Sequence, residues 1–173
     1  MIKRSYFVTL LLCLAFSALA FKPFDDWIRF TSPDGTYMIT MPGQPNKQVE
    51  TKDTPSGKIL SEIWISKTQG KLYLSGATDY PIDVDQKTEM ELDRDNFLKA
   101  VHATLDKDAE ITVNGYPGRE FTGSSDTYDF TSRLAMDGKR RVYQIVAGIP
   151  KDGDHSDVGK FLKSFEILKS VVK

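Results

Sequence analysis

Cysteine is almost absent from this chain of 173 residues, because its one cysteine, Cys13, lies in an N-terminal segment that we expect to be removed. The chain that remains can then form no disulfide and has no thiol nucleophile or thiolate metal ligand. Histidine is nearly as scarce, with only His102 and His155. Neither has a second histidine three or four residues away, which excludes the zinc pattern of a helix.

Catalytic motifs are also absent. The sequence has no Gly-x-Ser-x-Gly turn, no phosphate-binding loop and no dinucleotide-binding glycine pattern. Its asparagines, Asn46, Asn96 and Asn114, form no glycosylation sequon. A hydrolase with paired carboxylates stays open, since nothing selects a pair from the 24 acidic residues. We therefore expect a protein without a cofactor that is not an enzyme.

The first twenty residues have the features of a cleavable signal peptide. Lys3 and Arg4 precede an apolar stretch over residues 6–16, and the small residues Ala18 and Ala20 follow it. The stretch is shorter than the ~20 apolar residues of a membrane span, although an uncleaved anchor is the alternative. We expect cleavage near Ala20, a periplasmic or extracellular location, and no stable membrane insertion afterwards.

The remaining 153 residues suit one domain with a proper core, here a lead-in over residues 21–26 and a single domain over residues 27–173. Removal of Lys3 and Arg4 leaves 21 basic and 24 acidic residues, a net charge of −3. A mixed and mildly acidic surface argues against nucleic acid as a partner.

Turn residues divide the chain into short extended segments of the α+β class, and Asn114-Gly115 is a strong signal of a hairpin turn. Strands are predicted at residues 27–30, 36–41, 47–52, 58–66, 71–80, 110–113, 119–123, 128–136, 140–148 and 165–168. Thr88 and Glu91 form a capping-box pattern, and apolar spacing then predicts a helix over residues 89–106. A second helix is predicted at residues 156–163, capped by Asp154 or Ser156. Because several strands are apolar on both faces, we expect cover on both sides of the sheet.

Four segments resemble bacterial exported proteins of the PsbP-like class. They are Trp27-x-x-Phe30-x-Ser32-Pro33-Asp34-Gly35, Pro42-Gly43-x-Pro45, Tyr116-Pro117-Gly118-Arg119-Glu120-Phe121 and Phe161-Leu162-x-Ser164-Phe165. The resemblance implies an antiparallel sheet of about six or more strands sandwiched by helices, in three α/β/α layers. The fold is similar in the extrinsic protein of photosystem II and in a Ran-binding import factor, so it also implies an accessory or partner-binding role.

Two groups of residues are candidate sites. Arg119, Glu120 and Arg133 lie on predicted strands, where arginine could hold an anionic ligand or form a cross-strand ion pair. Asp152, Asp154 and Asp157 begin like a calcium loop. The EF-hand pattern nevertheless fails, because Asp157 and Lys163 occupy the positions of its glycine and glutamate.

The leading hypothesis is an exported, non-enzymatic domain that presents a sheet face or groove to a protein partner in the cell envelope. The alternative is a periplasmic carrier of a small ligand, with Trp27, Trp64 and several tyrosines lining a pocket. Aromatic residues in that number also suit an ordinary core.

Overall fold

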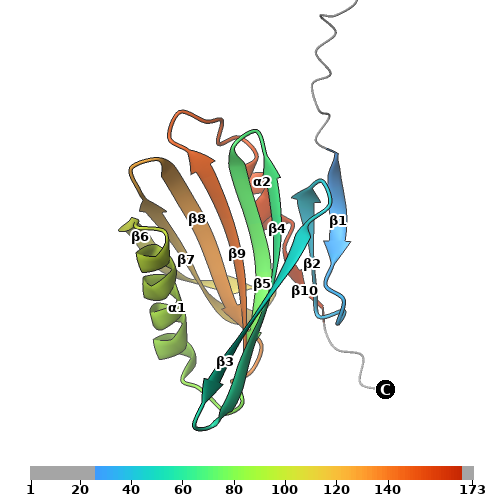
Figure 1. Ribbon diagram of the computed structural model, residues 1–173, viewed down its shortest axis with the longest axis vertical. Helices are drawn as coiled ribbons and strands as arrows, with labels where there is room; N and C mark the ends of the chain where they lie inside the picture. The colour runs from blue at the N-terminus through green and yellow to red at the C-terminus, as the bar shows by residue number, and fades with distance from the viewer. Residues whose placement is uncertain (1–25, 169–173) are drawn as a thin grey trace, which may run out of the picture.

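The computed structural model describes residues 26–168, and two antiparallel sheets form most of that region (Figure 1). The larger sheet has the order β3-β4-β5-β9-β8-β7-β6 and confirms the expected antiparallel sheet of six or more strands. Its strands are β3 (Asn46–Thr54), β4 (Gly57–Thr68), β5 (Lys71–Asp79), β6 (Thr104–Val113), β7 (Tyr116–Ser124), β8 (Tyr128–Met136) and β9 (Arg141–Pro150). The smaller sheet has the order β1-β2-β10, formed by β1 (Trp27–Thr31), β2 (Tyr37–Pro42) and β10 (Glu166–Ile167).

The predicted hairpin turns form where turn chemistry favours them. Asn114 and Gly115 both have positive φ, 50° and 88°, and join β6 to β7. This is the requirement of a two-residue hairpin turn of type I′. Between β1 and β2, the Ser32 hydroxyl accepts hydrogen bonds from the backbone N–H groups of Thr36 and Tyr37, each at 3.1 Å.

The first helix, α1 (Gln86–Ala100), lies earlier than the predicted range of residues 89–106. The capping-box prediction is wrong, because Asp85 is the N-cap and its carboxylate accepts from the Thr88 backbone N–H at 2.9 Å. The helix stops before His102, whose φ of +52° turns the chain into β6. Leu105 matched the helical spacing but lies on that strand.

The second helix, α2 (Val158–Lys163), begins two residues after its predicted start. Its N-cap is Asp157, which makes no side-chain capping bond. Asp154 instead accepts from the backbone N–H and the hydroxyl of Ser156, at 2.9 and 2.6 Å. The predicted caps Asp154 and Ser156 therefore bond each other in the preceding loop.

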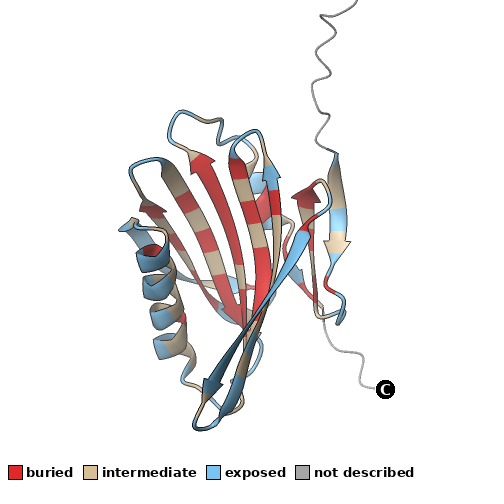
Figure 2. Cartoon of the chain, viewed as in Figure 1, coloured by how far each residue is buried: buried red, intermediate tan, exposed pale blue. Residues whose placement is uncertain are grey.

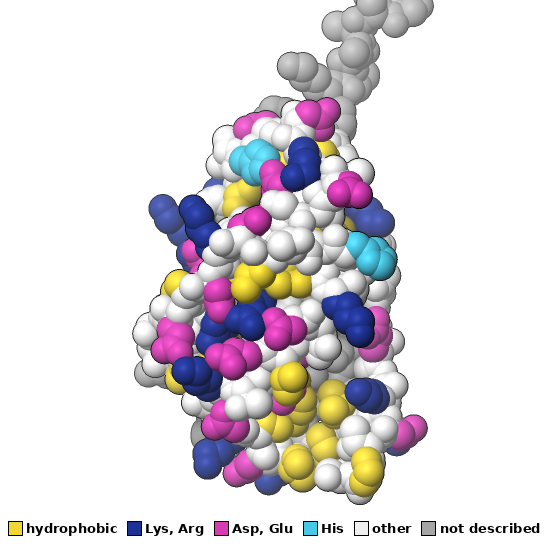
Figure 3. Space-filling model, turned by 90° about the vertical axis from the view of Figure 1, so that its left-hand side faces the viewer, with side chains coloured by type: hydrophobic (Ala, Val, Ile, Leu, Met, Phe, Trp, Pro, Cys, Tyr) yellow, Lys and Arg dark blue, Asp and Glu magenta, His cyan; other side chains and the backbone are white. Residues whose placement is uncertain are grey.

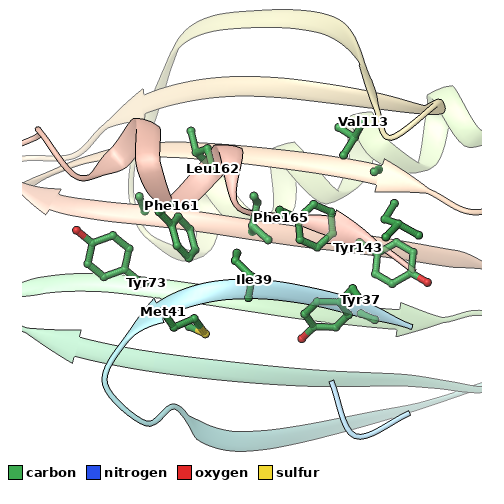
Figure 4. Close-up of a cluster of buried hydrophobic side chains, with 14 of the residues drawn as sticks. Tyr37, Ile39, Met41, Tyr73, Val113, Tyr143, Phe161, Leu162 and Phe165 are labelled. Atoms are coloured by element: carbon green, nitrogen blue, oxygen red, sulfur yellow. The ribbon is translucent and has the colours of Figure 1, made fainter. Parts of the chain in front are cut away.

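One face of the larger sheet packs on the smaller sheet and α2, where helical cover was expected. Tyr37, Ile39 and Met41 of β2 meet Tyr73 of β5 and Phe161 of α2 in the main core (Figure 4). The ring of Tyr73 lies 5.0 Å from that of Phe161, edge to face. The expected three-layer helical sandwich is thus not confirmed, because the β1–β2 hairpin and β10 build a second sheet over this face.

The other face carries α1, which packs over β7 and β8 (Figure 1). Met90 and Leu98 of α1 join Phe121, Leu134 and other residues in a second buried cluster. At Gly123 of β7 a side-chain carbon would lie only 2.4 Å from the Leu98 Cδ2 atom. Glycine at this position therefore lets the helix approach the sheet closely.

Neither described helix is long and apolar enough to cross a membrane. The predicted signal peptide lies outside the described residues, as does most of the lead-in over residues 21–26.

Candidate binding face

Beside α1, part of the larger sheet has an apolar face that no described element covers. Helix α1 contacts β7 and β8, whereas β4 and β5 meet β2 on their other face. Five aliphatic side chains of β4 and β5 point to the side of α1, are only half-buried, and belong to neither core cluster. These residues, which we call the open face, are Ile59, Ile63, Ile65, Leu72 and Leu74. Figure 2 shows buried and half-buried residues along β5 and mostly half-buried or exposed residues along β4, with no helix in front of them.

The pleat of the strands explains why the open face is apolar. Trp64 points to the opposite side, where its ring lies 4.8 Å from that of Phe30 in β1. Its neighbours Ile63 and Ile65 must then point toward the side of α1. Ile65 lies directly opposite Leu74 across the β4–β5 ladder, which joins the two strands' side chains into one strip.

The strip is long and ends in a hollow. Residues 59 and 65 are six positions apart, which corresponds to about 20 Å along a strand. At the Ile65 end, a hollow of about 420 Å³ lies between β3, β4 and the chain that leaves β2. It is lined by Pro42, Gly43, Gln44, Asn46, Gln48, Ile65 and Lys67. The face therefore offers an aliphatic strip with amide groups and one lysine at its end.

On the sheet side of α1, two carboxylates lie near a tyrosine. The Tyr80 hydroxyl donates to the Asp93 carboxylate at 3.5 Å, and Glu89 is one turn away on the helix. Burial, reinforced by the negative charge of Glu89, raises the pKa of Asp93 to about 7. Burial next to these carboxylates also raises the pKa of the Tyr80 hydroxyl. Asp93 thus changes charge near neutral pH.

Arg119, one of the predicted ligand residues, is 5% exposed beneath α1. Its guanidinium group bonds Asp108 of β6 and, at 3.0 Å, Glu91 of α1. Arg94 of the same helix also bonds Asp108. These ion pairs connect the helix to the edge of the sheet. Figure 3 shows that Lys and Arg side chains lie among Asp and Glu side chains on this side of the molecule.

Glu120 and Arg133, the other two predicted ligand residues, lie on the opposite face of the sheet from Arg119. They are direct partners across the β7–β8 ladder, and the Arg133 Nε atom donates to the Glu120 carboxylate at 2.6 Å. Arg133 also donates to the Leu162 carbonyl of α2 at 3.0 Å. The three predicted residues therefore do not converge on one site, and the ion pair forms the cross-strand alternative.

The predicted cation loop receives its positive charge from the chain itself. The ammonium of Lys71, whose side chain is 9% exposed, lies 3.6 Å from an Asp154 carboxylate oxygen and 3.5 Å from one of Asp157. Asp152 forms no ion pair with Lys71 in the described part of the chain. Among residues 26–168, no three His, Cys, Asp or Glu side chains are grouped so that they could hold a metal ion.

The aromatic residues suggested as a ligand pocket pack into the core. The Trp27 ring lies 5.3 Å from that of Tyr73, edge to face, and Trp64 contacts Phe30. The histidines lie apart from the open face: His102 is an exposed turn residue, and His155 lies 3.8 Å from Asp129. Neither tryptophan lines the hollow at the end of the open face.

The open face was not predicted from the sequence, although its signal was present. Apolar residues on both faces of β4 and β5 led us to expect cover on both faces. The pattern shows that both faces are apolar, but it does not show whether this chain supplies the cover.

Comparisons with known proteins add a partial structural likeness. No protein-family model matches the sequence, and no curated protein matches it. A crystal structure of a protein from Bacteroides thetaiotaomicron VPI-5482 matches with a TM-score of 0.40 and 14% identity, over 82% of this chain and 48% of that one. The chain thus spans about half the length of that protein, and at this TM-score neither fold nor function is transferred. The resemblance to PsbP-like proteins stays a prediction.

Proposed function

We propose that this chain is an exported accessory domain without enzymatic activity, which binds another protein of the cell envelope through the open face. The observation that supports the proposal is the aliphatic strip of β4 and β5, which no described element covers. Each Å² of these half-buried aliphatic side chains that stays in contact with water forgoes about 25 cal/mol that burial would provide. Contiguous apolar patches of this kind are typical of interaction sites.

The shape of the open face favours a protein over a small molecule. Small ligands bind in concave pockets that enclose most of their surface. The strip extends for about 20 Å along an open sheet. The lining of the hollow at its end includes the exposed residues Gln48 and Lys67. A protein surface can cover such a strip and still bond the amide groups of the hollow.

Site-specific photo-crosslinking in the cells that make the protein tests this proposal. A photo-reactive amino acid at Ile63 should give an adduct with one other protein, identified by mass spectrometry. The matched control is Leu92 of α1, which is 50% exposed and lies outside the open face. An excess of unlabelled chain should suppress the adduct, whereas an excess of a folded Leu74→Asp variant should not, because its carboxylate lies within the strip.

Three outcomes would overturn the proposal. They are no adduct from Ile63, equal adducts from Ile63 and Leu92, or competition by Leu74→Asp as strong as that by the unaltered chain. A small molecule released from the purified chain by denaturation, without a protein adduct, would instead support the carrier hypothesis.

A further inference from the structure

Among the described strands, β3 is one edge of the larger sheet and pairs only with β4 (Figure 1). All but the last of its nine residues are exposed. An edge strand presents a row of backbone N–H and C=O groups that have no ladder partner, and a second strand can use them as a template. A strand that pairs here must also have side chains that fit those of this edge.

In the described part of the chain, two of the four charged residues of β3 have an ion-pair partner and two do not. Lys47 pairs with Glu62 at 2.8 Å, and Asp53 pairs with Lys58 at 3.8 Å. Glu50 and Lys52 have no ion-pair partner within the described part of the chain, although both lie on the side of the open face. Two opposite charges on one face of an exposed edge, each without a partner, are complementary to the same two charges in reverse order.

We propose that a second copy of this chain pairs antiparallel with β3 about a two-fold axis at Thr51. In this register Glu50 of each copy lies opposite Lys52 of the other, and the two Thr51 residues face each other. Opposite charges and paired threonines both stabilise antiparallel strand pairs. A single edge thus supplies both sides of a self-complementary contact.

The neighbouring registers are less favourable. An axis at Glu50 would place Glu50 opposite itself, and an axis at Lys52 would place Lys52 opposite itself. An axis at Val49 opposes no like charges but leaves both Glu50 and Lys52 without an opposite charge. Like charges directly opposite each other are destabilising. Only the Thr51 register pairs the two charges that the described part of the chain leaves unpaired.

Pairing of this kind has a consequence for the open face. A two-fold axis perpendicular to the sheet preserves its faces, so both open faces lie on the same side of one continuous sheet of fourteen strands, seven from each copy. The two α1 helices then lie at the outer ends of this surface. In this register Thr54 of the second copy lies opposite Gln48, which lines the hollow.

Variants that exchange the charges of Glu50 and Lys52 test the proposal. Their association is measured by analytical ultracentrifugation of the chain as purified from the cells that make it, at micromolar to near-millimolar concentrations. The unaltered chain should show a monomer–dimer equilibrium that weakens with salt. Glu50→Lys or Lys52→Glu alone should weaken the dimer by about tenfold or more, because two attractive pairs become repulsive. The double exchange E50K/K52E should restore it.

The matched control is Lys107→Glu on the opposite edge strand β6, which makes the same change in net charge as Lys52→Glu and should leave the dimer unchanged. A monomer at every concentration, or a double exchange that fails to restore a dimer lost in the single variants, would overturn the proposal. The pairing does not depend on the proposed envelope partner. A monomer that still crosslinks at Ile63 would refute the pairing alone, and a dimer without crosslinking would refute the proposed function alone.

Discussion

Replacement of Asp93 by asparagine should stabilise the protein at neutral pH and remove part of its pH dependence. The carboxyl group lies between α1 and the sheet, beside Glu89 and the Tyr80 hydroxyl, and burial raises its pKa to about 7 from an ordinary value of 3.8. The unfolded chain therefore releases this proton between about pH 4 and pH 7, while the folded chain retains it.

The sign of the effect follows from this difference. Across that range the folded state binds more protons than the unfolded state, so the free energy of unfolding falls as pH rises and then becomes level above about pH 7. Each tenfold change in proton affinity between the folded and unfolded states corresponds to about 1.4 kcal/mol, which gives an upper bound of about 4 kcal/mol for Asp93. Asp93 retains some contact with water, and screening reduces the effect, so we expect about 2 kcal/mol.

Urea denaturation of the unaltered chain and of Asp93→Asn at a series of pH values between 4 and 8 measures the effect. The asparagine side-chain oxygen can still accept from Tyr80, so the two proteins should differ little near pH 4. The variant should be more stable by about 2 kcal/mol at pH 8. The control is Asp95→Asn, an exposed position on the same helix, where we expect a change below about 0.5 kcal/mol. Equal stability of Asp93→Asn and the unaltered chain at pH 8 would refute the reasoning.

Three further predictions concern the contact between α1 and the sheet, the ion pairs of Arg119 and the acidic loop before α2. Gly123→Ala should cost about 1–3 kcal/mol in urea denaturation, because its side chain would collide with Leu98 and lift α1 from β7; no loss would mean that the helix does not lie this close. Arg119→Met should cost about 2 kcal/mol because it removes the charge-assisted hydrogen bonds of a buried guanidinium group. Arg140→Met, which removes a pair whose arginine is 63% exposed, should cost below about 1 kcal/mol; equal costs would contradict the contribution expected of the buried arginine. Calcium should leave the thermal midpoint unchanged, because Lys71 lies between the loop carboxylates; a rise that saturates with calcium would contradict this.

The strand pattern of this protein could be predicted from local chemistry alone. Asn114-Gly115 formed the expected hairpin turn, because the positive φ that each residue needs is a local property. Helix boundaries were predicted less accurately: Leu105 continued the spacing of α1, yet the chain turned at His102 and placed it on β6. A periodic pattern cannot reveal where a turn interrupts it.

For the candidate site residues, too, a contact between neighbouring strands could be predicted, whereas contacts with more distant segments could not. The sequence indicated that Glu120 and Arg133 could form a cross-strand pair, and register placed them opposite each other. It offered no reason to expect that Arg119 would be buried beneath α1, since its partners Asp108 and Glu91 come from other elements. Partner choice over such separations depends on tertiary packing.

By itself, the sequence determined an antiparallel sheet with two apolar faces, because side-chain alternation and turn residues act within a few positions of the chain. Which element covers each face was decided only by the tertiary structure. The β1–β2 hairpin packed on one face together with α2, and α1 covered β7 and β8 on the other. Ile63, Ile65 and Leu74 have the residue types of core positions, but the described chain brings no element to cover them, because cover depends on contacts between segments far apart in sequence.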